Sequence, residues 1–159
     1  MSISSNNKRI DSVSRVIKAS PQTIYKSFID PEALVSWLPP KGMKGQIYEF
    51  DATNGGAYRM SLTYTDTKHA MPGKSSENTD IVKGRYLEFV PNERIVQLVE
   101  FESADPAYAG TMIMTWIFAE VSEGTEVTIV CENVPEGIRQ DDHLLGMNAS
   151  LENLALFTE

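Results

Sequence analysis

The segment 19–40 constrains the fold more than any other part of the chain, because prolines and a capping residue divide it into two short helices. Ser20 is suited to cap a helix whose first residue is Pro21, and apolar side chains at helical spacing carry that helix to about residue 30. Pro31 begins a second helical stretch, which Pro39-Pro40 ends because proline cannot continue a helix. We therefore expect two consecutive short helices near the start of the chain.

Apolar and polar residues alternate in the segments on both sides of these helices, as they do in strands with one buried face. A first strand is expected at Ile10–Ala19, and a hairpin between residues 43 and 64 turns at residues 53–56. The polar segment Asp66–Thr79 is expected to be a long loop or lid. Four further strands are expected at Ile81–Val90, Arg94–Glu102, Thr111–Val121 and Thr125–Val134.

A single long amphipathic helix is expected at the end of the chain, from Gln140 to Phe157. Leu144, Met147, Leu151 and Leu154 recur there at steps of three and four residues, which places them on one face. At about 1.5 Å per residue, a helix of this length lies across a whole twisted sheet. The predicted order is one strand, two short helices, six strands and one long helix.

The length and composition of the chain predict the number of domains and the broad class of the protein. With 159 residues, of which 42% are hydrophobic, we expect a single domain at residues 10–159, preceded by a disordered or frayed N-terminus at residues 1–9. The net charge is −8 and the basic residues are scattered, which argues against nucleic acid or an anionic membrane as partner. One cysteine, a polar N-terminus and no bilayer-length apolar run lead us to expect a soluble cytoplasmic protein.

A set of short motifs, ordered along nearly the whole chain, resembles one known family. The motifs are Ala19-Ser20-Pro21, Asp30-Pro31-Glu32-Ala33-Leu34 before Trp37, Lys41-Gly42, Gly55-Gly56 ahead of an aromatic strand, Gly84-x-Tyr86-Leu87-Glu88 running into Pro91-x-Glu93-Arg94, and His143-x-x-Gly146 before Leu151-x-x-Leu154. Over roughly residues 12 to 158 the chain resembles the Bet v 1-like, START-related superfamily (SRPBCC), and within it the family named after the activator of the Hsp90 ATPase. One departure is Met147, because tryptophan often follows the helix glycine in such proteins.

The resemblance implies an α+β helix-grip fold, in which a curved antiparallel sheet of about six to seven strands wraps around the C-terminal helix. It also implies a cavity between the sheet, the long helix and the two short helices. The residues themselves agree, because a strongly curved sheet cannot contact a straight helix along its whole length.

Candidate lining residues of this cavity are apolar side chains that alternate along the strands or face them from the helices. They are Tyr58, Met60, Leu62, Tyr86, Met112, Met114, Trp116, Phe118 and Ile129 on the sheet, with Trp37, Met147 and Leu151 opposite. The methionines among them suit permissive binding, because a flexible thioether adapts to irregular shapes. Each of these residues also fits the simpler interpretation of ordinary core packing.

His143 is the one polar candidate at the cavity. It is interpreted as a polar anchor near the cavity mouth, as a general base, or as a structural residue of the helix. The sequence shows no carboxylate or nucleophile beside it, which favours the structural role. His69 is expected to be solvated, and two distant histidines with one cysteine predict neither a metal site nor a cofactor.

The remaining reactive residues have structural explanations. Cys131 alternates with Val127 and Ile129 on an apolar face, where a thiol behaves as a small hydrophobe. Carboxylates crowd the end of one strand and the start of the last helix, where solvated surface charge explains them better than acid–base chemistry. The strand carboxylates are Glu100, Glu102 and Asp105, and the helix carboxylates are Asp141 and Asp142.

Three functions remain open from the sequence. The leading prediction is non-catalytic binding of a small hydrophobic or aromatic ligand. The second is a chaperone-associated interaction protein, although such co-chaperones carry a further N-terminal domain and this chain offers only about 10 residues before its first strand. The third is an enzyme acting on a polyketide-like molecule, as the resemblance to this superfamily implies. A homodimer is also possible, but no self-complementary patch is evident.

Overall fold

The computed structural model describes residues 9–39, 42–65 and 79–159, which form one antiparallel sheet, three α-helices and a short 3-10 helix at Pro106–Tyr108. The sheet order is β1-β7-β6-β5-β4-β3-β2. The strands are β1 (Ile10–Ile17), β2 (Met43–Phe50), β3 (Ala57–Tyr64), β4 (Thr79–Val90), β5 (Arg94–Phe101), β6 (Met112–Val121) and β7 (Gly124–Glu132), and the helices are α1 (Pro21–Ile29), α2 (Pro31–Trp37) and α3 (Gln140–Thr158). This is the expected helix-grip architecture, with the two short helices after the first strand and the long helix last.

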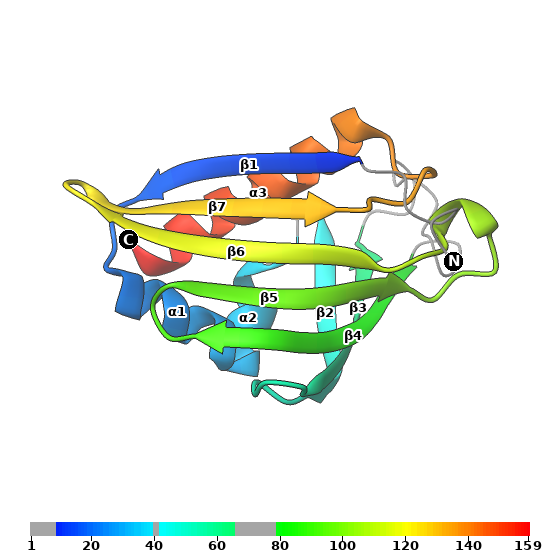
Figure 1. The fold of residues 1–159 in the computed structure, drawn as a ribbon, viewed down its shortest axis with the longest axis horizontal. Coiled ribbons are helices and arrows are strands. Elements are labelled where there is room, and N and C mark those ends of the chain that lie inside the picture. The colour runs from blue at the N-terminus through cyan, green and yellow to red at the C-terminus, as the bar shows by residue number, and fades with distance from the viewer. Residues whose placement is uncertain (1–8, 40–41, 66–78) are drawn as a thin grey trace.

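The sheet curves around the helices. Figure 1 shows β2 and β3 turned out of the direction of β6 and β7, with α3 running behind the sheet. The pairing register shifts between Ile47 and Glu49 and again between Tyr86 and Glu88. Such irregularities bend a strand and increase its twist, so they account for part of the curvature.

Local signals in the sequence place the two short helices. The Ser20 side chain accepts a hydrogen bond from the Thr23 amide at 3.2 Å, and the Asp30 side chain accepts one from the Glu32 amide at 3.0 Å. Each cap is followed by a proline at the start of its helix, where the missing N–H costs nothing. The predicted starts of both helices are therefore confirmed.

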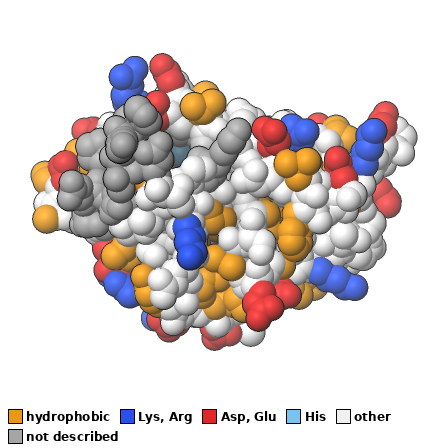
Figure 2. All heavy atoms as spheres, turned by 180° about the vertical axis from the view of Figure 1, so that it is seen from behind, with side chains coloured by type: hydrophobic (Ala, Val, Ile, Leu, Met, Phe, Trp, Pro, Cys, Tyr) orange, Lys and Arg blue, Asp and Glu red, His pale blue; other side chains and the backbone are white. Residues whose placement is uncertain are grey.

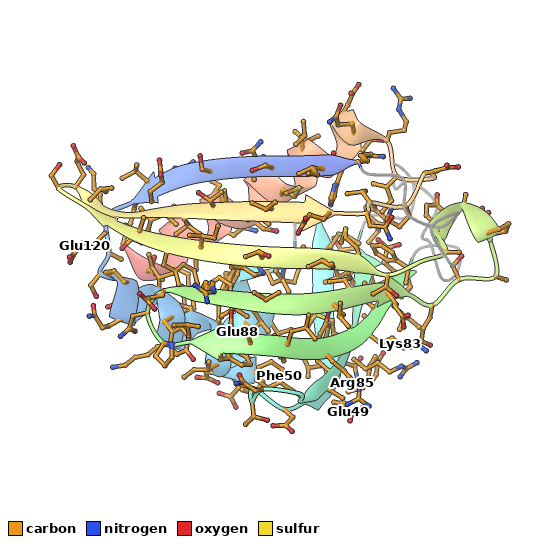
Figure 3. All side chains as sticks on the ribbon, viewed as in Figure 1. Glu49, Phe50, Lys83, Arg85, Glu88 and Glu120 are labelled. Atoms are coloured by element: carbon orange, nitrogen blue, oxygen red, sulfur yellow. The ribbon has the colours of Figure 1, made fainter. Side chains whose placement is uncertain are left out.

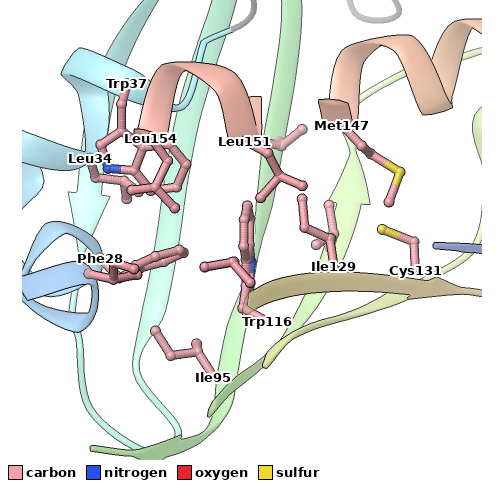
Figure 4. Packing of buried hydrophobic residues seen from close by; sticks show 14 of the residues in the cluster. Phe28, Leu34, Trp37, Ile95, Trp116, Ile129, Cys131, Met147, Leu151 and Leu154 are labelled. Carbon is pink, nitrogen blue, oxygen red and sulfur yellow. The ribbon is translucent and has the colours of Figure 1, made fainter. Parts of the chain in front are cut away.

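Aromatic side chains join the short helices to the sheet. The Phe28 ring lies 4.8 Å from the rings of Trp37 and Trp116 (Figure 4). The Phe118 ring lies 5.2 Å from that of Phe28. The Trp37 indole also donates a hydrogen bond to the Ser27 carbonyl at 3.0 Å. This cluster fills the end of the sheet beside α1 and α2 with ordinary core.

Charged and buried side chains alternate along the strands. In β4, Lys83 and Arg85 are exposed whereas Val82 and Tyr86 are buried. Figure 3 places Lys83, Arg85 and Glu88 along the β4 side of the molecule. None of the helices in the described part of the chain is long and apolar enough to cross a membrane.

Two sequence predictions concern residues at or beyond the limits of the described chain. The loop or lid at Asp66–Thr79, with His69, lies outside the described residues except for Thr79, which begins β4. Of the segment predicted to be disordered or frayed, residues 1–8 also lie outside them, and Arg9 is described. Its guanidinium pairs with Asp11 at 2.8 Å, and its carbonyl accepts a hydrogen bond from the Asn133 amide at 3.0 Å.

Candidate functional site

A cavity of about 270 Å³ lies between the concave face of the sheet and the first half of α3. Its walls are mostly apolar, with five methionines among them. The lining residues are Leu38, Met43, Tyr58, Met60, Leu62, Tyr64, Asp80, Val82, Gln97, Val99, Phe101, Met112, Met114, Trp116, Ile129, Ile138, Asp142, His143, Gly146, Met147 and Ser150. Figure 2, which views the molecule from behind, shows hydrophobic side chains exposed in the middle of the visible face, beside one basic side chain, with further charged side chains of both signs toward its edge.

The structure brings nine of the thirteen predicted lining residues to this cavity. They are Tyr58, Met60, Leu62, Met112, Met114, Trp116, Ile129, His143 and Met147. The other four do not line it. Trp37 and Phe118 belong to the aromatic cluster around Phe28, Leu151 is fully buried, and the ring of Tyr86 packs 4.6 Å from that of Phe89.

Several lining residues were missed because their signals are weak. Val82 and Val99 lie at inward positions of β4 and β5, as the predicted lining residues do. They were not predicted to line the cavity because a small apolar side chain at such a position gives no specific signal. Gly146 also lines the cavity, although it carries no side chain. A Cβ atom built on Gly146 has no heavy atom within 4 Å, so the absence of a side chain there leaves space beside the helix.

Polar atoms on the cavity wall are held by the protein itself. The Tyr58 hydroxyl donates to the Leu98 carbonyl at 2.5 Å, and burial raises the pKa of Tyr58 well above its ordinary value. The Trp116 indole donates to the Gln97 side-chain oxygen at 3.0 Å, and the Ser150 hydroxyl donates to the Leu38 carbonyl at 2.9 Å. These bonds fix the side chains, so the wall is largely organised before anything binds.

A buried ionic cluster adjoins the cavity at the first turn of α3. His143 Nδ1 lies 2.7 Å from Asp11 Oδ2, and Arg9 contacts the same carboxylate with Nε at 3.1 Å and Nη2 at 2.8 Å. Gln140 Nε2 donates to Asp11 Oδ1 at 3.2 Å, and a further Arg9 nitrogen donates to the Ile138 carbonyl. The expectation that His143 has no carboxylate beside it was therefore wrong.

Asp11 is 1% exposed, on the inward side of β1. Burial alone would raise the pKa of its carboxyl, but the hydrogen bonds and charges of Arg9 and His143 outweigh burial and lower that pKa. The sequence does contain a signal for this burial. Position 11 has the same alternation phase as Val13 and Ile17, so its side chain lies on the same inward face of β1.

The other reactive side chains have structural roles. Cys131 is fully buried opposite Asp11, and burial together with the Asp11 charge raises the pKa of its thiol to about 12. Glu102 pairs with Arg59 at 2.6 Å, and Glu100 accepts a hydrogen bond from the Thr111 hydroxyl at 2.9 Å. Among the described residues, no cluster of three or more His, Cys, Asp or Glu side chains is placed to hold a metal ion.

Solved structures of bacterial proteins share this fold. A Chromobacterium violaceum protein is 37% identical, with a TM-score of 0.83 over 94% of this chain and 96% of its own. A Rhodobacter sphaeroides protein is 18% identical, with a TM-score of 0.72 over 96% of this chain and 91% of its own. An Arthrobacter aurescens protein is 14% identical, with a TM-score of 0.76 over 94% and 85% of the two chains.

Sequence comparison assigns the family. No curated protein sequence matched the chain. The profile of a family described as "Activator of Hsp90 ATPase homolog 1-like protein" matches residues 18–159, which span both short helices, six of the seven strands and the long helix. The chain belongs to the Activator of Hsp90 ATPase homolog 1-like family, within the Bet v 1-like superfamily.

Proposed function

We propose that this protein binds a small, largely apolar molecule in the cavity and releases it unchanged. The observation that carries the proposal is a mostly apolar cavity of about 270 Å³, beside a helix glycine and between the sheet and α3. Concave, mostly apolar pockets with a few polar groups are the usual sites of small-molecule binding, which supports this role for the cavity.

The chemistry of the walls supports binding without covalent catalysis. Cys131 does not line the cavity, and its raised thiol pKa keeps it protonated near neutral pH. The Ser150 hydroxyl is engaged with the Leu38 carbonyl. The methionines and aromatic rings instead offer a polarizable surface that accommodates ligands of different shapes.

The cavity carries its own probes for a binding experiment. Five of the seven methionines line it, and they are Met43, Met60, Met112, Met114 and Met147. Protein labelled with ¹³C on the methionine methyl groups is titrated with 2-methoxynaphthalene, an apolar two-ring compound. Saturable shifts at these methyls are expected. The exposed side chains Leu87 and Leu156 serve as controls when their methyls are labelled in parallel, and their signals should stay in place.

Native mass spectrometry of freshly purified protein complements the titration. An extra mass that unfolding releases identifies the natural ligand class. A clean mass together with unmoved methionine methyls would reject the proposal. Stimulation of an Hsp90 ATPase by the same protein, with no response of the cavity, would favour a partner-binding role suggested by the family description.

A further inference from the structure

We propose that Gln97 is the polar recognition group of the cavity and selects apolar molecules that carry a neutral hydrogen-bond acceptor, such as the carbonyl oxygen of a ketone or ester. This inference rests on the proposed function, because it specifies which ligands the cavity accepts. Its basis is a cavity-lining amide whose oxygen is already used within the protein, whereas its donor capacity is only partly used.

Gln97 occupies an inward position of β5, in the middle of the sheet. It alternates with Ile95 and Val99, which are both buried and apolar. Gln97 itself lines the cavity and is only partly buried. An apolar side chain would fill this position at a lower cost, because an amide that leaves water needs hydrogen-bond partners for its polar atoms. The partners of Gln97 therefore indicate what the residue does.

The orientation of the Gln97 amide follows from its contact with Trp116. The indole N–H can only donate a hydrogen bond, and it lies 3.0 Å from Gln97 Oε1. The amide oxygen is therefore turned toward the indole, and Nε2 is turned away from it. An indole partner permits only this assignment of the two amide atoms, so the position of the donor is fixed.

The protein uses at most one of the two hydrogens on Gln97 Nε2. Burial raises the pKa of Tyr58, and a hydrogen bond from the Gln97 side chain opposes that rise. The Tyr58 hydroxyl donates its own hydrogen to the Leu98 carbonyl at 2.5 Å, so its oxygen accepts the bond from Nε2. Among the described residues, the second Nε2 hydrogen has no partner. It is available to a molecule in the cavity.

The charges around the cavity favour a neutral acceptor over a carboxylate. An anion loses its hydration when it enters a mostly apolar cavity, and it then needs a compensating cation. No described lining residue is a lysine or an arginine, whereas Asp80 and Asp142 both lie on the wall. His143 is paired with Asp11 at 2.7 Å. A carbonyl oxygen needs only a hydrogen bond, which the amide offers.

The size of the cavity and the rings beside Gln97 limit the rest of the ligand. A volume of about 270 Å³ lies at the lower end of small-molecule sites, which suits a molecule of one or two rings. Tyr58 and Trp116 line the same cavity and offer aromatic surface against which such rings pack. An aromatic ketone of two fused rings meets this description.

The test uses two neutral probes of the same shape, 2-acetonaphthone and 2-isopropenylnaphthalene. They differ only in that a carbonyl oxygen in the first is a methylene group in the second. Affinities are measured for the wild-type protein and for Gln97→Met, whose side chain has a similar length and no amide. The ketone should lose about tenfold relative to the hydrocarbon in Gln97→Met, which corresponds to about 1.4 kcal/mol and one hydrogen bond. Comparing the ratio cancels general effects of the substitution on the cavity.

Two further variants separate the donor from other effects of the substitution. Gln46→Met is the matched control, because Gln46 is exposed on β2 and is not among the lining residues. It should leave both affinities unchanged. Gln97→Glu keeps an oxygen for the Trp116 indole but lacks the amide hydrogens. At about pH 8.5, where the carboxylate is ionised, it should lose the ketone preference as Gln97→Met does.

A measurement on the wild-type protein decides the inference even if Gln97→Met does not fold. ¹H–¹⁵N NMR resolves the two amide protons of the Gln97 side chain. Binding of 2-acetonaphthone should move one of them downfield relative to its position with 2-isopropenylnaphthalene. Because the two probes carry the same rings, this difference reports the hydrogen bond to the carbonyl oxygen.

Each contrary result has a distinct meaning. If both probes bind but the affinity ratio is the same in wild-type protein and Gln97→Met, or the amide protons respond equally to both, the inference is overturned. Gln97 then only satisfies the Trp116 indole, and the proposed function still stands. Tighter binding of 2-naphthoate than of 2-acetonaphthone also overturns it, because the cavity would then select an anion. Failure of every probe to bind overturns the proposed function, and this inference with it.

Discussion

At the scale of single residues, the unusual feature is a carboxylate buried among apolar side chains. Asp11 lies opposite Cys131 in the sheet and is enclosed by Arg9, Gln140 and His143. A buried charge is tolerated when it is paired and hydrogen-bonded. Removing it leaves its charged partners without a compensating charge. Asp11 therefore couples the start of β1 to the first turn of α3, and Arg9 extends the cluster to the Ile138 carbonyl before that helix.

Replacing Asp11 with Asn should lower the free energy of unfolding by about 3 kcal/mol at neutral pH, because Arg9 and His143 lose the charge between them. Since the folded state lowers the pKa of Asp11 below 3.8, the unfolded chain binds a proton there at a higher pH than the folded chain. The contribution is complete above about pH 5 and is lost as the pH falls through the lowered folded pKa. Urea unfolding from pH 2 to pH 7 measures it.

Glu88→Gln provides the matched control for that substitution. Glu88 pairs with Arg94 at 2.8 Å, but both side chains are partly exposed to solvent, at 42% and 47%. Exposed pairs of this kind contribute little to stability. A loss in Asp11→Asn no greater than in Glu88→Gln, or one that persists unchanged in acid, would contradict the account of Asp11.

The pairing of Asp11 with His143 could not be predicted from the sequence, for a physical reason. The two residues are 132 positions apart, and their contact depends on where β1 pairs with β7 and on how α3 crosses the sheet. Alternation in β1 places Asp11 on the inward face, but it does not reveal what lies across from it. Charged residues on inward positions are therefore the ones to examine first for missing partners.

At the scale of elements, most boundaries followed from local signals. Ser20 and Asp30 cap their helices, and prolines start both. Turn residues separate the hairpins, and the expected strands agree with the described ones within a few residues. Such features are predictable because neighbouring residues decide them, whereas the bulges near Ile47 and Tyr86 depend on the partner strand.

Two glycines with open space around them should respond oppositely to alanine. Gly146 lies within α3, where Ala is favoured over Gly, so Gly146→Ala should raise the free energy of unfolding by about 0.5–1 kcal/mol. Gly42 has φ +88°, a left-handed conformation that side chains disfavour, so Gly42→Ala should lower it by about 1 kcal/mol or more. Neither added Cβ has a heavy atom within 4 Å, so sterics do not decide the outcome.

Thermal and urea unfolding of the two variants make this comparison. A loss of stability in Gly146→Ala would show that the glycine is required by backbone conformation or packing. A gain, with weaker binding of 2-methoxynaphthalene, would show that the glycine keeps the cavity open at a cost to the stability of α3.

At the scale of the whole molecule, one continuous apolar interior is divided into a packed half and an open half. The Phe28 cluster fills the end beside α1 and α2, and the cavity lies beside the first half of α3. Alternation in the sequence marks the inward face of every strand, but it does not say where the sheet and helix diverge. Trp37 and Phe118 were therefore predicted as lining, although they lie in the packed half.

Met147 allows the open half to be closed by a single substitution. It lies in α3 on the cavity wall and is 5% exposed, and tryptophan often occupies this position in proteins that the chain resembles. Met147→Trp should place an indole ring in the cavity and weaken binding of 2-methoxynaphthalene at least tenfold. The melting temperature should hold or rise, because the ring gains contacts that the open cavity lacks. Calorimetric titration and thermal unfolding check both effects.

Leu156→Trp is the matched control, because it adds the same ring to the same helix at a side chain that is 73% exposed. It should leave binding unchanged. Unchanged binding in Met147→Trp as well would mean that the probe binds elsewhere on the protein. If Met147→Trp instead unfolds at a markedly lower temperature, the cavity wall is too rigid to accept the indole ring. The open space beside the Gly146 Cα would then not extend to the side chain at position 147. Loss of binding with stability retained would show that the open half serves the ligand and is not needed for folding.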